Sequence, residues 1–251
     1  MSIFDQKVIK YEMKPLSSLE KVFPDETPVY RMECQMLSGL WGETVSFQVA
    51  YTGDFVMRER LDVRVVSELA EHVHVRTVEM VPVGRATNGI VDDNYLKTIS
   101  GLYPDLLKDL KDGKVIVYSR QWRSLWVDVD ITNEIPAGEY EIELQLIKEG
   151  EVVCSAKQKV TVIGTELPKL DIMHTEWMHA DCLADYYHVE VFSEEHWKLL
   201  ENYFQEYVKR DCNMMLTPLF TSPLDTAIGL ERTTCQLIDV EVKDGEYVFG
   251  F

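Results

Sequence analysis

The sequence predicts an N-terminal antiparallel β-sandwich followed by the first βαβ portion of a (β/α)₈ TIM-type barrel. Two observations lead to this prediction. Up to about residue 165, short segments alternate between polar and apolar side chains, as strands with one buried face do. Beyond that point, two short apolar segments flank a longer segment with helical spacing. We therefore predict a β-sandwich domain over residues 1–165 and an incomplete barrel over residues 166–251.

The strands of the first half are predicted from strict alternation. The clearest segments are residues 43–50, 61–66, 73–78, 126–131 and 140–147. The last of these is followed by residues 152–162, and the pair reads as a hairpin that turns through residues 148–151. Residues 89–112 are predicted to be a long loop with at most one helical turn. Trp122 and Trp126 occupy alternate positions, which favours a core face over a carbohydrate platform.

The second half predicts one βαβ unit and a hairpin. Residues 169–174 and 213–218 are the two predicted strands, with a loop after the first. Residues 193–210 form a predicted helix, because its apolar residues recur at helical spacing and Ser193 is a suitable N-cap. The dipeptide Asp244-Gly245 between two alternating runs predicts a β-hairpin at the end of the sequence.

Composition excludes several partners. The formal net charge is −18, and no local Lys/Arg cluster is visible in the sequence, so nucleic acid and anionic membranes are not expected as partners. The N-terminal residues lack the pattern of a secretory signal, which predicts a cytoplasmic protein if that terminus is native. The five cysteines show no metal-ligand spacing and are predicted to be reduced and mostly buried.

Residues 166–251 are far fewer than the roughly 250 that a (β/α)₈ barrel needs. One βαβ unit cannot bury both faces of its sheet. We therefore expect the barrel either to be incomplete or to be completed by another chain, with possible self-association through its exposed edges.

Three segments of the second half resemble a known family. Residues 174–192 read HTEWMHADCLADYYHVEVF, residues 213–226 read NMMLTPLFTSPLDT, and residues 231–237 read ERTTCQL. They resemble the start of the catalytic domain in glycoside hydrolase family 123, which includes β-N-acetylgalactosaminidases. The resemblance is close over about residues 166–240 and loose over the rest. It implies a β-sandwich joined to a (β/α)₈ barrel, and retaining, substrate-assisted hydrolysis of 2-acetamido sugars without a cofactor.

The resemblance also implies an adjacent Asp–Glu catalytic pair on a later barrel strand. The sequence has one Asp-Glu dipeptide, Asp25-Glu26, which is predicted to be a solvated turn. The catalytic pair is therefore expected beyond residue 251, and this chain alone is expected to be inactive. Two other functions stay open: a non-catalytic β-sandwich that binds carbohydrate or protein, and a relative that has lost catalysis.

Candidate substrate-binding residues follow the two predicted barrel strands, because barrel enzymes act at the carboxyl ends of their strands. Trp177 and Phe220 can stack on a sugar ring or pack under their loop, while the polar residues can bind hydroxyl groups. The candidates are His174, Glu176, Trp177, His179, Asp181, Thr217, Phe220 and Asp225. No metal site is predicted, since His174 and His179 do not have HExxH spacing. His196 is predicted to lie at the surface.

Overall fold

The computed structural model describes residues 10–28, 36–54, 58–85, 95–169, 171–221 and 226–250. The chain forms two compact units, Met1–Pro168 and Lys169–Phe251. Within the described residues, no helix combines the length and the apolar character that crossing a membrane requires.

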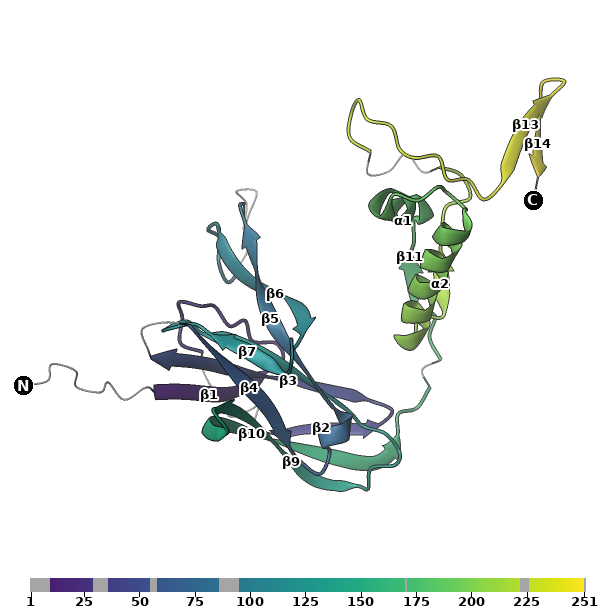
Figure 1. Ribbon diagram of the computed structural model, residues 1–251. Coiled ribbons are helices and arrows are strands. Elements are labelled where there is room, and N and C mark those ends of the chain that lie inside the picture. The colour runs from purple at the N-terminus through teal and green to yellow at the C-terminus, as the bar shows by residue number, and fades with distance from the viewer. Residues whose placement is uncertain are drawn as a thin grey trace, which may run out of the picture. The chain divides into compact units, whose positions relative to one another are not determined.

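The N-terminal unit contains two five-stranded sheets (Figure 1). The first sheet has the order β1 (Lys10–Ser17), β3 (Thr44–Asp54), β8 (Arg123–Asp130), β5 (Val73–Val83) and β6 (Gly101–Asp109). The second has the order β2 (Met36–Trp41), β10 (Glu151–Glu166), β9 (Gly138–Lys148), β4 (Glu59–Val66) and β7 (Lys114–Val117). A short 3₁₀ helix, Ala70–His72, precedes β5. The pairs are antiparallel except for β2 and β10, which are parallel.

One hydrophobic core lies between the two sheets. Alternate residues of each strand point into it, since successive side chains of a strand face opposite sides. The contributions of β8 and β9 illustrate this: Leu125, Val127 and Val129 from one sheet, and Ile142, Leu144 and Leu146 from the other, all fully buried. Each such side chain contributes about 1.5–3 kcal/mol through removal from water.

The alternating segments of the sequence correspond to strands β3, β4, β5, β8 and β9, so these predictions are confirmed. The hairpin of β9 and β10 is also confirmed, and its turn contains Glu149 and Gly150 with positive φ angles of 52° and 90°. The prediction for the two tryptophans was wrong in part. Trp122 is buried in a separate small cluster with Leu16, Val22 and Ala50, whereas Trp126 is partly buried and donates its Nε1–H to Asp128.

The prediction of a long loop over residues 89–112 was wrong. Residues 101–109 form strand β6, which pairs antiparallel with β5 at the edge of the first sheet. The strand has no clear alternation and contains Pro104, which a strand tolerates at a sheet edge or near a bulge. Its register shifts between Val78 and Met80 of β5. Pairing with β5, and not its own pattern, makes this segment a strand. Residues 89–94 of the predicted loop lie outside the described residues.

The second unit consists of short elements. They are β11 (Thr175–Trp177), α1 (Ala180–Tyr187), α2 (Glu194–Lys209), β12 (Met214–Leu216), β13 (Asp239–Lys243) and β14 (Glu246–Gly250). Strands β11 and β12 are parallel neighbours, with Thr175 opposite Met214 and Trp177 opposite Leu216. This arrangement confirms the predicted βαβ order and places the carboxyl ends of both strands at one edge.

The predicted hairpin and the long helix are confirmed. Asp244 and Gly245 both have positive φ, 52° and 85°, as a type I′ turn between antiparallel strands requires. Ser193 accepts a hydrogen bond from the backbone N–H of His196, so it caps α2 as predicted.

Two predictions in the second unit were wrong. The first strand comprises Thr175–Trp177 and not residues 169–174, and the following segment contains helix α1 where a loop was predicted. Two turns of helix give too short a pattern to recognise, and α1 buries only Asp181 and Ala184. Overall, the fold is mostly β-strand with several sheets.

Candidate functional site

The segments that follow β11 and β12 lie together. The backbone N–H of Met178 donates to the carbonyl of Leu216 across a distance of 2.9 Å, which holds the two strand ends side by side. A cleft of only about 10 Å³ lies beside this contact. Four predicted site residues line it, together with Cys235 and Leu237: His179, Asp181, Thr217 and Phe220.

Arg232 forms hydrogen bonds with two of the residues that line this cleft, Asp181 and His179. Its Nε donates to Asp181 Oδ2, and its Nη2 lies 3.1 Å from Asp181 Oδ1, so the two side chains form a bidentate pair. Both are nearly buried, with 12% and 8% of their side-chain surface exposed. The Nη2 of Arg232 also lies 2.9 Å from His179 Nδ1. A guanidinium only donates, so this nitrogen of His179 is an acceptor and the ring proton resides on Nε2.

The segment around Arg232 forms three further hydrogen bonds with other parts of the second unit. Thr233 Oγ1 donates to Asp185 Oδ1 at 2.5 Å, and the backbone N–H of Cys235 donates to Thr221 Oγ1 at 3.1 Å. The N–H of Leu237 donates to the carbonyl of Leu219 at 3.0 Å. The segment is therefore joined to α1 and to the residues that follow β12. Arg232 was not among the predicted site residues, because its partner Asp181 is far away in the sequence.

Two exposed aromatic rings flank the strand ends. Trp177, the last residue of β11, is 63% exposed, and Phe220 is 45% exposed. The ring of Phe220 lies 6.3 Å from that of Phe249 in β14. Neither ring is buried under its loop, so both remain accessible to a ligand.

His174 and Glu176 do not line the cleft at the ends of β11 and β12. His174 precedes β11 and Glu176 lies within it, so the prediction that both follow the strand was wrong. His174 Nε2 is 3.4 Å from Glu176 Oε1, and His174 Nδ1 is 3.6 Å from the sulfur of Cys212, which precedes β12. The donor atoms of these three residues lie within 4.8 Å of one another, and they are the described residues best placed to hold a metal ion. Asp225 lies outside the described residues. Sugar binding by the predicted residues stays a prediction.

The surface position predicted for His196 was wrong, because its side chain is fully buried. Nδ1 accepts from the backbone N–H of Phe192, and Nε2 lies 2.9 Å from the carbonyl oxygen of Ala180. This histidine has a structural role between the two helices.

The Asp25-Glu26 dipeptide is an exposed turn, as predicted. Both carboxylates pair with Lys97 Nζ, at 3.0 Å and 2.8 Å. The hydrogen bond from Lys97 lowers the pKa of Asp25. A catalytic acid that protonates a leaving group needs a raised pKa, so Asp25 is not suited to that role.

The cysteine prediction was wrong in one respect. The four described cysteines, Cys154, Cys182, Cys212 and Cys235, are free, but Cys182 is exposed and the other three are only partly buried. Burial raises the pKa of Cys154 to about 12 and is the largest cause of the raised pKa of Cys235. Both thiols are therefore poor nucleophiles near neutral pH. Cys34 lies outside the described residues.

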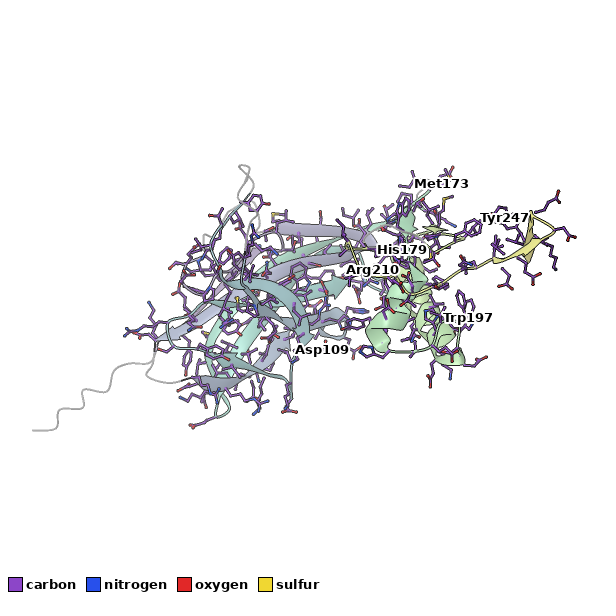
Figure 2. The ribbon with its side chains drawn as sticks, turned by 90° about the horizontal axis from the view of Figure 1, so that it is seen from above. Asp109, Met173, His179, Trp197, Arg210 and Tyr247 are labelled. Carbon is purple, nitrogen blue, oxygen red and sulfur yellow. The ribbon has the colours of Figure 1, made fainter. Side chains whose placement is uncertain are left out.

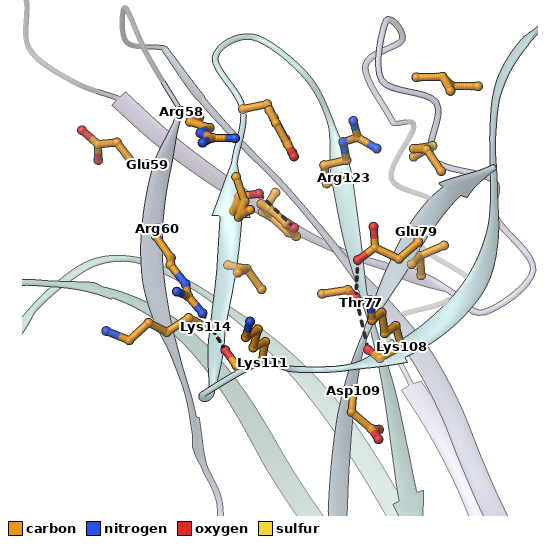
Figure 3. Close-up of a pocket in the computed structure, with 17 residues that line it drawn as sticks. Arg58, Glu59, Arg60, Thr77, Glu79, Lys108, Asp109, Lys111, Lys114 and Arg123 are labelled. Carbon is orange, nitrogen blue, oxygen red and sulfur yellow. Dashed lines mark hydrogen bonds between the residues drawn. The ribbon is translucent and has the colours of Figure 1, made fainter. Parts of the chain in front are cut away.

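A larger cavity lies in the N-terminal unit (Figure 3). It has a volume of about 710 Å³ and is lined by strands β4 and β7 of one sheet and β5 and β6 of the other. Six basic residues line it: Arg58, Arg60, Lys108, Lys111, Lys114 and Arg123. We call this cavity the basic groove. The sequence has no local Lys/Arg cluster, and the fold gathers these six residues from separate segments.

Comparison with known proteins gives one family. Residues 177–251 match the family model described as "Glycoside hydrolase 123, catalytic domain". The structure resembles that of a family 123 glycoside hydrolase from Clostridium perfringens, analysed for glycolipid glycan hydrolysis, with a TM-score of 0.67 and 14% identity. The match covers 96% of this chain and 43% of that one. A β-glucosidase from Listeria innocua gives a TM-score of 0.29 at 10% identity, over 64% of this chain and 17% of that one. No curated protein matches the sequence.

The first structural match shows a shared fold over nearly the whole chain, and the family match locates a catalytic-domain sequence in the second unit. These findings relate the second unit to the glycoside hydrolases as a class. The particular family model that residues 177–251 match is that of glycoside hydrolase family 123, so the resemblance seen in the sequence is confirmed. The chain spans less than half the length of the solved structure that it matches.

Proposed function

We propose that this chain forms part of a glycoside hydrolase that cleaves 2-acetamido sugars with retention of configuration. The observation that carries the proposal is the match of residues 177–251 to the catalytic domain of family 123. The proposal includes a β-sandwich over residues 1–165 and the first part of a (β/α)₈ barrel over residues 166–251. Two facing sheets and a parallel βαβ pair support this architecture.

The proposed reaction is substrate-assisted. The acetamido oxygen of the sugar attacks the anomeric carbon, while a carboxylic acid protonates the departing glycosidic oxygen. Water then opens the resulting cyclic oxazolinium ion from the opposite face, so two inversions give net retention. Residues 169–251 contain no adjacent Asp–Glu pair to orient the acetamido group and supply the proton. The proposed contribution of this chain is to bind and position the substrate.

We propose different roles for the residues at the ends of β11 and β12. Trp177, the exposed last residue of β11, is proposed to stack on the apolar face of a sugar ring, and the exposed ring of Phe220 is proposed as a second stacking surface. His179 is proposed to donate its Nε2–H to a sugar hydroxyl, and Thr217 offers a second polar group. Asp181 is nearly buried and occupied by Arg232, so it is proposed as a positioning residue that fixes Arg232 and, through it, the ring of His179.

The test requires a protein that carries these residues together with a complete catalytic domain. We expect hydrolysis of an aryl 2-acetamido-2-deoxyglycoside and none of the matched 2-hydroxy glycoside. A 2-trifluoroacetamido substrate should react more slowly, because fluorine makes the attacking carbonyl oxygen less nucleophilic. NMR of the first-formed product should show the anomer of the substrate. Equal rates with and without the acetamido group would contradict substrate assistance.

The cleft is tested separately by substitution. Trp177→Ala should lower kcat/KM by about fivefold, mainly through KM, because ring stacking contributes on the order of 1 kcal/mol. Trp197→Ala is the matched control, since Trp197 is a similarly exposed tryptophan on α2, at 47%. Arg232→Gln should also weaken binding by misplacing His179. Equal effects of the two tryptophan substitutions would contradict a site at the end of β11.

A further inference from the structure

The basic groove lies where the two sheets of the N-terminal unit both end. Strand β6 is the last strand of the first sheet and β7 is the last strand of the second. The groove runs between them, and Arg123 at the start of β8 and Arg58 ahead of β4 complete it (Figure 3). Its volume falls in the range of small-molecule sites, about 300–1,000 Å³.

The charge of the groove is opposite to that of the chain. Its lining includes six basic residues and three acidic ones, Glu59, Glu79 and Asp109, while the whole chain has a formal net charge of −18. Glu59 is already engaged by Lys148 and Tyr11, neither of which lines the groove. A concave site with one predominant sign of charge concentrates ligands of the opposite sign.

Several of these cations have no acidic partner among the residues that the structure describes. Arg60 pairs with Asp112 at 3.0 Å and Lys114 pairs with Asp62 at 3.2 Å. By contrast, no ion pair to a described carboxylate is found for Arg58, Lys108, Lys111 or Arg123.

The Nε of Arg123 is buried and has no hydrogen-bond partner among the described residues. The guanidinium of this residue lies over the ring of Tyr118, 4.9 Å from its centroid. The Nη2 of Arg123 donates to Gln121 Oε1 at 3.2 Å, and because an unsatisfied buried donor is costly, an acceptor that reaches the Nε is favoured.

Exposed apolar side chains accompany the cations. Leu102 of β6 is 48% exposed and Ile116 of β7 is 38% exposed, and both line the groove. A ligand that suits this lining carries negative groups together with C–H faces. An acidic sugar has both features, whereas a bare inorganic anion has only the first.

We propose that the basic groove binds a short acidic oligosaccharide whose carboxylate or sulfate groups contact Arg58, Lys108 and Arg123. A long polyanion such as nucleic acid is disfavoured, because most of it would lie against the acidic remainder of the surface. A short ligand stays within about one Debye length, roughly 8 Å at physiological salt, of the groove cations. The proposal depends on the proposed function only for the choice of a carbohydrate as ligand.

The test is isothermal titration calorimetry of the 251-residue chain with three ligands. They are a trimer of galacturonic acid, a sulfated galactose trimer and the unmodified, neutral galactose trimer. We expect both anionic trimers to bind and the neutral one not to bind. Affinity should fall at least tenfold between 50 mM and 500 mM salt because the contacts are ionic. Comparing the carboxylated and sulfated trimers identifies which anion the groove prefers.

Charge-reversal substitutions test whether the acidic ligand binds in the basic groove. Arg58→Glu combined with Lys108→Glu should lower the affinity at least tenfold, since charged hydrogen bonds are lost and repulsion replaces them. Arg64→Glu with Lys243→Glu is the control, because it changes the net charge equally at two exposed positions outside the groove. Circular dichroism checks the fold of each variant. Arg58→Gln with Lys108→Gln replaces the first variant if it does not fold.

Three results with the trimers would overturn the proposal. They are equal binding of the neutral and acidic trimers, no binding of either acidic trimer, and equal losses in the groove and control variants. Tighter binding of a short single-stranded oligonucleotide than of both acidic trimers would indicate a nucleic-acid site and would also overturn it. None of these results affects the hydrolysis assay, which reports on the second unit.

Discussion

At the scale of single residues, Glu59 links the two sheets of the N-terminal unit. This residue of β4 receives hydrogen bonds from the hydroxyl of Tyr11 in β1 and from Lys148 Nζ in β9, the latter at 2.9 Å and 3.0 Å. Burial tends to raise the pKa of Glu59, but the two hydrogen bonds and the charge of Lys148 outweigh it and hold the pKa below its ordinary value. Burial and the bond to Glu59 raise the pKa of Tyr11.

This linkage gives the protein a defined response to acid. A carboxyl group with a lowered folded-state pKa stabilises the fold above its unfolded pKa, about 4.3, and loses that contribution as the pH falls through the folded pKa. We expect Glu59→Gln to lower the free energy of unfolding at pH 7 by about 1 kcal/mol and to differ little from the parent at pH 3. Urea unfolding across this pH range measures the effect.

The control is Glu151→Gln, which removes an exposed carboxylate at the start of β10. It should leave the pH dependence of unfolding unchanged. If Glu59→Gln and the parent show the same loss of stability between pH 7 and pH 3, the linkage through Glu59 is wrong.

At the scale of elements, the sequence predicts those strands whose own residues alternate. Strands β8 and β9 bury every second side chain in a shared core, so their pattern is strong. Strand β6 lies at a sheet edge with most of its residues exposed, and only its pairing with β5 determines it. The alternation of polar and apolar residues arises because one face of a strand is buried. Strands that bury few side chains therefore show little alternation in the sequence.

The same reasoning applies to the candidate site. The βαβ order predicts that His179, Thr217 and Phe220 lie near one another, because parallel strands end at the same edge. Arg232 and Asp181 are 51 positions apart in the sequence, so no local sequence pattern predicts that they form a pair. Charged pairs of this kind follow from the tertiary fold. For the same reason, the cations of the basic groove are scattered along the sequence.

Helices α1 and α2 are coupled through His196. The side chain is fully buried, and it bonds to the backbone of Phe192 before α2 and of Ala180 in α1. His196→Ala leaves an N–H and a carbonyl without partners and opens a cavity, so we expect a loss of about 2–4 kcal/mol in the stability of the second unit. Hydrogen exchange of the amides in α1 and α2 measures this loss.

His188→Asn is the matched control for that substitution. His188 is exposed and has a positive φ of 57° at the end of α1, a conformation that asparagine tolerates. The control should change amide protection by less than about 0.5 kcal/mol. Similar losses in both variants would show that His196 does not couple the helices.

At the scale of the whole molecule, the second unit exposes many large apolar side chains. Figure 2 shows Trp197 on α2 and Tyr247 on the hairpin of β13 and β14, which are 47% and 72% exposed. Phe204 and Val208 continue the apolar stripe of α2 and are 39% and 69% exposed. Soluble monomers seldom expose apolar surface in continuous patches, because contact between such patches removes them from water.

We therefore expect the 251-residue chain to self-associate through the second unit. Light scattering over a hundredfold concentration range should show a rising mean mass. Phe204→Glu with Val208→Lys should shift this rise to higher concentration, since charges interrupt the stripe without changing the net charge. Leu106→Glu is the control, because Leu106 is a 58% exposed leucine on β6 of the other unit. A constant monomer mass at every concentration would contradict the prediction, and an equal response of both variants would place the contact outside α2.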